Sequence, residues 1–243
     1  GQANNGASGY NVIDFVTVSS TGNAQDFGDQ TTQTRSQIGL SNSTRGITAG
    51  GTSGFPSGTY LNTIEYVTMQ AAGNTVDFGD LTVIRDFPTG VNSSVRAIIA
   101  GGNQYPTNYN IIDYITTATL GNATDFGDLS ENGYLMGGVC NAVRSIRMGG
   151  YESTNAGARR DHIEYVTTAT LGNMTDFGNL TAIKSDGGTA SSSTRGIFMG
   201  GTPGPSTLQT IDYIQIMTTG DAMDFGDMSA YPIEDNVGVS NGH

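Results

Sequence analysis

The sequence has 243 residues with 36 glycines, no tryptophan and one cysteine, and its 22 acidic and 10 basic side chains give a formal net charge of −12. Such a chain lacks the clustered lysine and arginine that nucleic acid or an anionic membrane would require. No run of about 18 apolar residues predicts a transmembrane helix, and residues 1–10 predict no signal peptide. Short apolar runs separated by polar, glycine-rich turns predict an all-β protein.

The first repeated feature along the chain is an alternating run with an acid followed by an aromatic residue, as in Val12-Ile-Asp-Phe-Val-Thr. Its period of two and its β-branched residues predict a strand. The run occurs five times in the sequence. Its aromatic residues are Phe15, Tyr66, Tyr114, Tyr165 and Tyr213, and the acids before them are Asp14, Glu65, Asp113, Glu164 and Asp212.

The second feature is the tripeptide Asp-Phe-Gly, which positions magnesium in protein kinases. Five copies, spaced by 51, 48, 51 and 48 residues, exclude a single active site, and no glycine-rich loop or HRD segment accompanies them. We expect each phenylalanine to pack between repeats and each Asp and Gly to form a tight turn. The Gly-Asn or Gly-Asp pairs before them predict hairpin turns. The copies begin at Asp26, Asp77, Asp125, Asp176 and Asp224, and the pairs lie at 22–23, 73–74, 121–122, 172–173 and 220–221.

Two further runs follow most copies of the tripeptide. A run of small residues, such as 136–141 or 187–192, suits the crowded innermost strand of a radial sheet. An arginine-containing strand then ends in a glycine pair, at 44–51, 95–102, 143–150 and 194–201. We expect cross-strand ion pairs between the strand acids and these arginines, with an anion-binding arginine ring along a channel as the alternative. The arginines are Arg45, Arg96, Arg144 and Arg195.

The repeat is therefore a unit of about 50 residues with four short antiparallel strands, the fourth running through or just after Asp-Phe-Gly-Asp. Such a unit is typical of a β-propeller blade. We therefore predict a five-bladed, kelch-like β-propeller as one domain over residues 1–243. The repeats cover about 31–81, 82–129, 130–180 and 181–228, and residues 229–243 with 1–30 form the fifth blade. The alternative is that the chain is a piece of a longer polypeptide, because an arginine strand is absent from the fifth repeat.

The order of glycine pair, loop, tyrosine strand and outer aromatic residue resembles the kelch motif. The strand tyrosines match the kelch tyrosine, and Phe27, Phe78, Phe126, Phe177 and Phe225 stand where kelch has tryptophan. The wording Ile-Asp-Tyr-Ile-Thr-Thr-Ala-Thr-Leu-Gly-Asn-Ala-Thr-Asp-Phe-Gly-Asp-Leu is similar to kelch-like repeats in structural proteins of marine tailed phages, including cyanophages. This resemblance implies a tail-fibre or surface protein of a virion.

Catalytic chemistry is not indicated. The two histidines, His162 and His243, lie outside the repeated strands, and no Ser/His/Asp arrangement or phosphate loop is present. Neither a galactose-oxidase-type copper site nor a sialidase-type Asp box is present. Cys140 fits a small buried residue better than a nucleophile. We expect no enzyme and no cofactor, although calcium at paired acids such as Asp125 and Asp128 stays open.

The loops after the glycine pairs differ most between copies, and function on a repeated scaffold usually lies in such segments. Aromatic and arginine side chains among small polar residues suit contact with proteins or glycans; a merely tolerant surface is the alternative. We predict host-receptor binding by an extracellular virion protein, without nucleic-acid binding or membrane insertion. Purely structural assembly with other virion proteins, a homo-oligomer and a lectin-like propeller are alternatives. The candidate binding residues are Phe55, Tyr60, Tyr105, Tyr109, Tyr151, Arg159 and Arg160.

Overall fold

The computed structural model describes residues 10–54, 58–152, 158–229, 232–233 and 237–238. Throughout these residues the regular structure is entirely β, and every strand pairing is antiparallel. The all-β prediction is therefore confirmed. Within the same ranges no helix occurs that is long and apolar enough to cross a membrane.

Four four-stranded sheets make up most of the molecule, and a two-stranded sheet precedes them. Each sheet is a meander, in which strands that are neighbours in the sheet also follow one another in the sequence. In the first two four-stranded sheets, a short pair of strands is inserted between the second and third strands. We call the four sheets units 1 to 4 and the two-stranded sheet the half-unit. The half-unit contains β1 (Val12–Phe15) and β2 (Gln25–Asp29). Unit 1 contains β4 (Ile38–Ser41), β5 (Arg45–Ala49), β8 (Thr63–Thr68) and β9 (Val76–Asp80). Unit 2 contains β10 (Thr89–Asn92), β11 (Arg96–Ala100), β14 (Ile111–Thr116) and β15 (Thr124–Asp128). Unit 3 contains β16 (Gly137–Cys140), β17 (Arg144–Glu152), β18 (Ala158–Thr167) and β19 (Thr175–Asn179). Unit 4 contains β20 (Gly188–Ser191), β21 (Arg195–Met199), β22 (Thr210–Gln215) and β23 (Met223–Asp227).

Two small sheets lie between these strands. One joins β3 (Thr34–Arg35), β6 (Thr52–Ser53) and β7 (Thr59–Tyr60), and the other joins β12 (Asn103–Gln104) and β13 (Thr107–Asn108).

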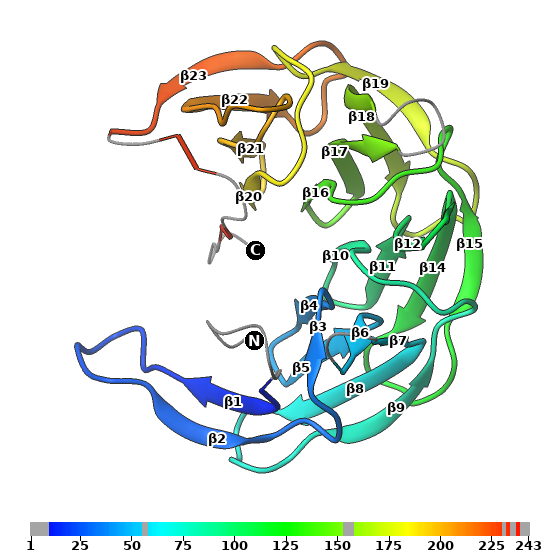
Figure 1. Ribbon diagram of the computed structural model, residues 1–243, viewed down its shortest axis with the longest axis vertical. Coiled ribbons are helices and arrows are strands. Elements are labelled where there is room, and N and C mark those ends of the chain that lie inside the picture. Colours follow the sequence, from blue (N-terminus) through cyan, green and yellow to red (C-terminus); the bar gives the residue numbers. More distant parts are fainter. Residues whose placement is uncertain (1–9, 55–57, 153–157, 230–231, 234–236, 239–243) are drawn as a thin grey trace.

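The units stand side by side in an arc around an open centre, with the half-unit at one end and unit 4 at the other (Figure 1). The small-residue strands β4, β10, β16 and β20 line the centre, as their composition predicts, and the Asp-Phe-Gly strands β9, β15, β19 and β23 form the outer rim. Each unit lies inside one of the four repeats that the sequence spacing defines.

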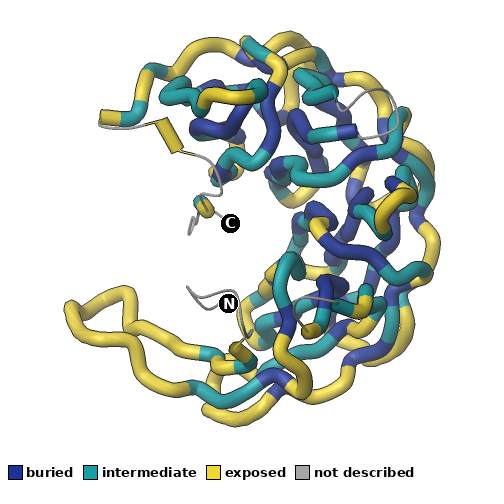
Figure 2. Tube along the Cα trace, in the orientation of Figure 1, coloured by how far each residue is buried: buried dark blue, intermediate teal, exposed yellow. Residues whose placement is uncertain are grey.

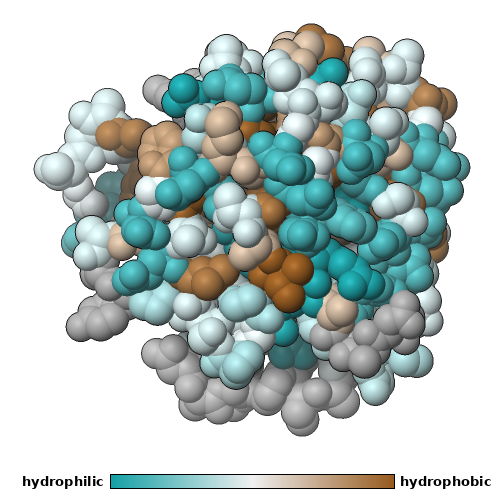
Figure 3. Space-filling view, turned by 90° about the horizontal axis from the view of Figure 1, so that it is seen from above, coloured by the Kyte–Doolittle hydropathy of each residue, from teal (hydrophilic) through white to brown (hydrophobic). Residues whose placement is uncertain are grey.

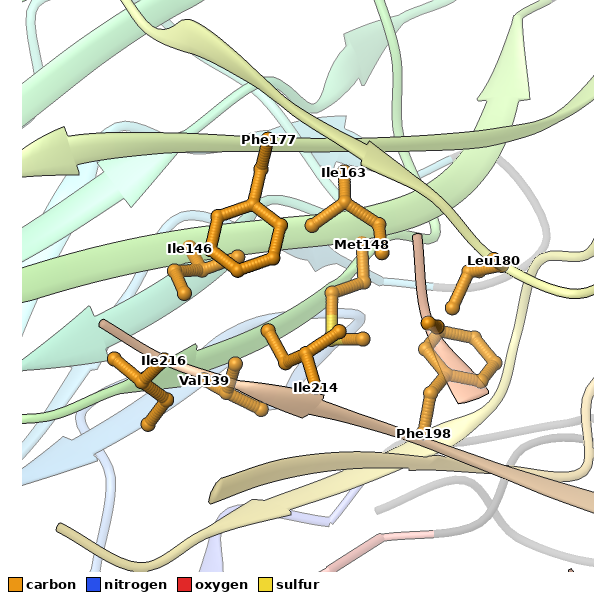
Figure 4. Close-up of a cluster of buried hydrophobic side chains, with 10 residues drawn as sticks. Val139, Ile146, Met148, Ile163, Phe177, Leu180, Phe198, Ile214 and Ile216 are labelled. Carbon is orange, nitrogen blue, oxygen red and sulfur yellow. The ribbon is translucent and has the colours of Figure 1, made fainter. Parts of the chain in front are cut away.

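The hydrophobic core lies within the units and at the junctions between neighbouring units (Figure 2). At the junction of units 3 and 4, Phe177 from β19 and Ile163 from β18 pack with Ile214 from β22 and Phe198 from β21 (Figure 4). The tripeptide phenylalanines of units 1 to 3, Phe78, Phe126 and Phe177, are each only 2% exposed. Their predicted packing between repeats is therefore confirmed for these three copies. Phe27 is half-buried, and Phe225 is 55% exposed.

The Asp-Phe-Gly segments are strands, which confirms the strand predicted through or just after each copy, whereas the tight turn expected for the Asp and Gly is wrong. Each lies in the outer strand of its sheet, and a β-bulge interrupts its pairing with the aromatic strand. Gly127 shows why glycine is needed: its φ is +148°, and a Cβ there would stand 2.4 Å from the carbonyl oxygen of Gly172 in unit 3. The glycine therefore permits close contact between neighbouring units.

The Gly-Asn and Gly-Asp pairs dock against the preceding sheet instead of forming two-residue hairpin turns, which corrects the second turn prediction. At the junction of units 2 and 3, Gly172 N donates to Phe126 O (2.8 Å), Met174 N donates to Asp128 O (2.8 Å), and Asp128 N donates to Asn173 Oδ1 (3.0 Å). The same three bonds recur at the other three junctions. We call residues 22–24, 73–75, 121–123, 172–174 and 220–222 the Gly-Asn segments.

The strand arginines do not pair with the strand acids, and they do not form a ring along a channel. Each stacks on the tyrosine of its own unit, at 4.3–5.0 Å from guanidinium carbon to ring centroid. Three of them also donate to a carbonyl in the following unit; Arg45 Nη1, for example, lies 2.7 Å from Thr117 O. The cross-strand pairs fail because Arg45 stands opposite Thr68 in the register and Glu65 opposite Thr48.

Other cations neutralise the strand acids of units 2 to 4. The carboxylate of Asp113 lies 2.6 Å from Arg85 Nη2, and neither side chain is exposed. In unit 4, Lys184 Nζ lies 3.0 Å from Asp212, again with both side chains fully buried. In unit 3 a glycine, Gly133, replaces the cation at the equivalent position. There Arg147 in β17 pairs with Glu164 at 2.9 Å.

Candidate functional site

The segments after the four glycine pairs form a surface that we call the loop face, comprising residues 52–62, 103–110, 151–161 and 202–209 apart from 55–57 and 153–157. The glycine pairs end β5, β11 and β21, or bend β17, because their φ values are positive. In unit 3 the strands β17 and β18 continue past the pair and carry Tyr151 and Arg159 opposite each other. A scaffold of paired strands therefore positions these variable side chains.

The predicted residues of units 1 and 2 contact one another. Tyr105 is 78% exposed, and its amide donates to the hydroxyl of Tyr60 at 3.2 Å. Tyr109 Oη donates to Gln104 Oε1 at 2.9 Å, within the β12–β13 hairpin and its continuation. The prediction for Phe55 falls outside the described residues.

The predicted residues of unit 3 divide into two roles. Arg159 lies over the ring of Tyr151, at 5.3 Å, and its Nε has no hydrogen-bond partner within the described part of the chain. Arg160 instead forms ion pairs with Glu131 (3.1 Å) and Glu152. Arg159 therefore stacks on Tyr151 with a buried Nε, whereas the two ion pairs of Arg160 hold the loop in place.

Two aromatic residues that the sequence patterns did not single out join this surface. Tyr134 packs edge-on against Tyr151 with ring centroids 5.3 Å apart, and Phe87 lies 6.2 Å from Tyr134. We call Phe87, Tyr134, Tyr151 and Arg159 the aromatic cluster. Phe87 and Tyr134 come from the connections that lead into units 2 and 3. The residues of the cluster therefore do not lie in one continuous segment of the sequence.

The backbone at these connections repeats an unusual conformation. Four non-glycine residues at matching or adjacent positions have positive φ values. The amide of Phe87 donates to Ser36 O (2.8 Å), and that of Asp186 donates to Leu135 O (3.1 Å), so two of these connections are bonded to the one before them. Left-handed backbone at non-glycine residues is costly and is kept where the surroundings hold it. The four residues are Ser36 (57°), Phe87 (47°), Leu135 (55°) and Asp186 (60°).

Burial shifts the pKa values of two ionisable groups beside the cluster upward. Burial raises the pKa of Tyr134, and the neighbouring Tyr151, Asp186 and Asp86 add to the shift. Burial also raises the pKa of Asp86, against the hydrogen bond from Thr52 Oγ1 at 2.9 Å. Tyr134 therefore keeps its hydroxyl proton to higher pH than an exposed tyrosine does.

The open centre of the arc forms a cavity of about 700 Å³. The inner strands supply polar groups such as Ser41, Asn92 and Ser191, and β1 supplies Val12, Ile13 and Asp14. No arginine lines it within the described ranges, which leaves no anion site of the kind considered from the sequence.

No reactive or metal-binding centre is evident among the described residues. No three His, Cys, Asp or Glu side chains gather there in a way that could hold a metal ion. Cys140 is buried as predicted, its pKa is raised by burial, and its thiol donates to Asn92 O at 3.2 Å. A protonated, enclosed thiol is a poor nucleophile.

Comparisons with known proteins add no assignment: no family model matches this sequence, and no curated protein matches it.

Proposed function

We propose that this protein is a non-enzymatic interaction module, a five-bladed kelch-like β-propeller of a phage virion appendage that binds a host receptor with its loop face. The observation that carries the binding role is the aromatic cluster. Phe87, Tyr134 and Tyr151 join two different units into one partly exposed surface with Arg159 beside it. Aromatic and arginine side chains held by a rigid scaffold are typical binding hot spots.

Two ends of the chain support a fifth blade. In the half-unit, β1 and β2 correspond to the third and fourth strands of a complete unit. After β23, Gly201 N donates to Ile233 O at 2.9 Å, the same bond that Gly51 N makes to Arg85 O at 2.8 Å. Gly238 then lies against Thr189 of β20, as Gly138 lies against Gly90. In the proposed ring, Gly238 lies at the position of an inner strand of the fifth blade, and β1 and β2 supply the outer pair.

The virion assignment rests on the similarity of the repeat sequence to structural proteins of marine tailed phages. On the face shown in Figure 3, hydrophobic residues form small groups among hydrophilic and intermediate ones, a mixture that suits the exposed surface of a particle. A role as host-attachment protein accounts for the variation of the loops against the constant scaffold.

A glycan is the receptor chemistry that the aromatic cluster favours over a protein. Sugar rings stack on aromatic faces, and a tyrosine hydroxyl and an arginine guanidinium beside those faces supply donors for sugar hydroxyl groups. Pure assembly within the virion is the second candidate, because the exposed edge of β23 offers a surface for another subunit.

Binding of the purified chain to a glycan array and to a panel of marine bacterial cells tests the proposal. We expect Tyr151→Ala, and the double variant Tyr105→Ala with Tyr109→Ala, to weaken binding about 30-fold if they are hot spots. The control Val95→Ala changes a residue that is 59% exposed in the turn at the opposite end of β11. Binding that the Tyr151→Ala variant and the double variant both retain, as the control does, would refute the loop face as the receptor site.

A further inference from the structure

The half-unit exposes a strand edge that every complete unit covers. In units 1 to 4 the aromatic strand pairs on one side with the outer strand and on the other with the arginine strand. In the half-unit, β1 pairs with β2 alone among the described residues. Apolar side chains along β1 and the residues after it are exposed: Val12 in β1 is 51% exposed, and Val16 and Val18, which follow β1, are 58% and 96% exposed. An open apolar edge of this kind is a template for strand addition.

The side chains along this edge lack the partners that the other units provide. The aromatic residues of units 1 to 4 each carry a strand arginine over the ring, whereas no cation stacks on Phe15 within the described chain. Asp14 is exposed, although Asp113 and Asp212 are fully buried at the equivalent positions. The cavity beside β1 is lined by Val12, Ile13 and Asp14 on one side and by Val237 and Gly238 on another.

We infer that this edge binds an extended polypeptide segment from outside these 243 residues, with the pattern Arg-small-Ile-x-x-Gly-Gly, as the missing second strand of the fifth blade. The inference rests on the proposed five-bladed arrangement. The sequence holds five aromatic strands and four arginine strands. Those four are each paired on both edges, so they cannot fill the fifth position without leaving their own sheets.

Unit 1 specifies the register of the added strand. Arg45, Ile47 and Ala49 stand opposite Thr68, Tyr66 and Ile64. Transferred to β1, the corresponding residues of the ligand stand opposite Thr17, Phe15 and Ile13. The ligand arginine would then lie over Phe15, and its guanidinium would reach the carbonyl of Met69, as Arg45 reaches that of Thr117.

One backbone bond gives a clean test of this register. In the complete units, the amide three residues after the aromatic residue donates to the carbonyl just before the arginine; Thr117 N, for example, lies 2.9 Å from Val95 O. Val18 is the equivalent residue of the half-unit. It also occupies the second position of the turn in which Ser20 N donates to Thr17 O, where proline is favoured. Val18→Pro therefore removes one donor without opposing the turn.

Titration calorimetry with the synthetic peptide Thr-Arg-Gly-Ile-Thr-Ala-Gly-Gly, a copy of residues 44–51, tests the inference on the whole chain. We expect saturable one-to-one binding and slower hydrogen exchange of the amides in 12–18. Val18→Pro should weaken binding about two- to tenfold through one lost hydrogen bond, and Val18→Ala should not. A peptide with alanine for arginine should bind about two- to fivefold more weakly.

Several results would overturn the inference. These are an absence of saturable binding at millimolar peptide, equal binding of a scrambled peptide, an unchanged affinity of Val18→Pro, and protection at Met223–Asp227 instead of β1. Concentration-dependent self-association of the chain without peptide, with protection of β1, would identify a second copy as the occupant and would also contradict it. Because the loop face takes no part, failure of receptor binding leaves this test unaffected.

Discussion

The junctions inside the arc and its two open ends contain the same sequence motifs in different surroundings. Phe126, at an inner junction, is 2% exposed, and Phe225, in the last copy of the tripeptide, is 55% exposed. The Gly-Asn segment of unit 3 makes three hydrogen bonds to unit 2, whereas residues 22–24 of the first segment are all exposed and make no such bonds within the described residues. The motif itself therefore does not create a core: burial requires a neighbouring unit.

Removal of the tripeptide phenylalanine should have the largest effect, and only inside the arc. Phe126→Ala should lower the free energy of unfolding by about 3–5 kcal/mol, because it leaves a cavity between units 2 and 3. Phe225→Ala should cost less than about 1 kcal/mol because the ring is already exposed. Urea denaturation of both variants measures the difference. Equal losses would mean that the exposed end is covered in solution.

Loss of a strand acid should also lower the free energy of unfolding more inside the arc than at its ends. Asp113→Ala leaves Arg85 charged, fully buried and without its carboxylate, which should cost about 3–5 kcal/mol. Asp14→Ala, at the equivalent exposed position, should change the unfolding free energy by less than about 0.5 kcal/mol. A small loss for Asp113→Ala in urea denaturation would mean that water reaches Arg85.

Removal of a strand arginine should produce a smaller difference in unfolding free energy between the inside of the arc and its end. Arg96→Ala removes a ring contact at 4.7 Å and hydrogen bonds to unit 3, and should cost about 1–3 kcal/mol. Arg195 is exposed and stacks on Tyr213 without a carbonyl partner in the described chain, so Arg195→Ala should cost about 0.5–1 kcal/mol. Thermal unfolding of the two variants side by side measures this gap. A larger loss for Arg195→Ala would indicate that it already contacts the half-unit through a closed ring.

The smallest expected effect is a pH dependence at Asp86. Its pKa is raised in the folded protein above the ordinary value of 3.8, so the folded state holds this proton more tightly than the unfolded state. The resulting contribution to stability is complete below about pH 3.8 and is lost as the pH rises through the folded pKa. Asp86→Asn should therefore flatten the decline of the urea midpoint above pH 3.8. If the charge-matched Asp14→Asn flattened it equally, net charge and not burial would be responsible.

The candidate site was only partly predictable. The loops after the glycine pairs could be found because they vary between copies, and Tyr151 and Arg159 were selected on that ground. Phe87 and Tyr134 were missed because they lie in the connections between sheets, about 50 residues apart, and meet only where units 2 and 3 stand side by side. The partners of the strand acids were wrongly assigned for a similar reason. Arg85 reaches Asp113 from the connection before β10, and pairing along adjacent strands cannot reveal that contact.

The sequence alone determined the strands, their order within each repeat and the small-residue inner edge, because alternation, glycine pairs and small side chains act over a few neighbouring residues. Only the tertiary structure decided which phenylalanines are buried, which cations neutralise the acids and which aromatic residues form one surface. These properties depend on contacts between units, and a repeated motif cannot show whether its neighbour is present.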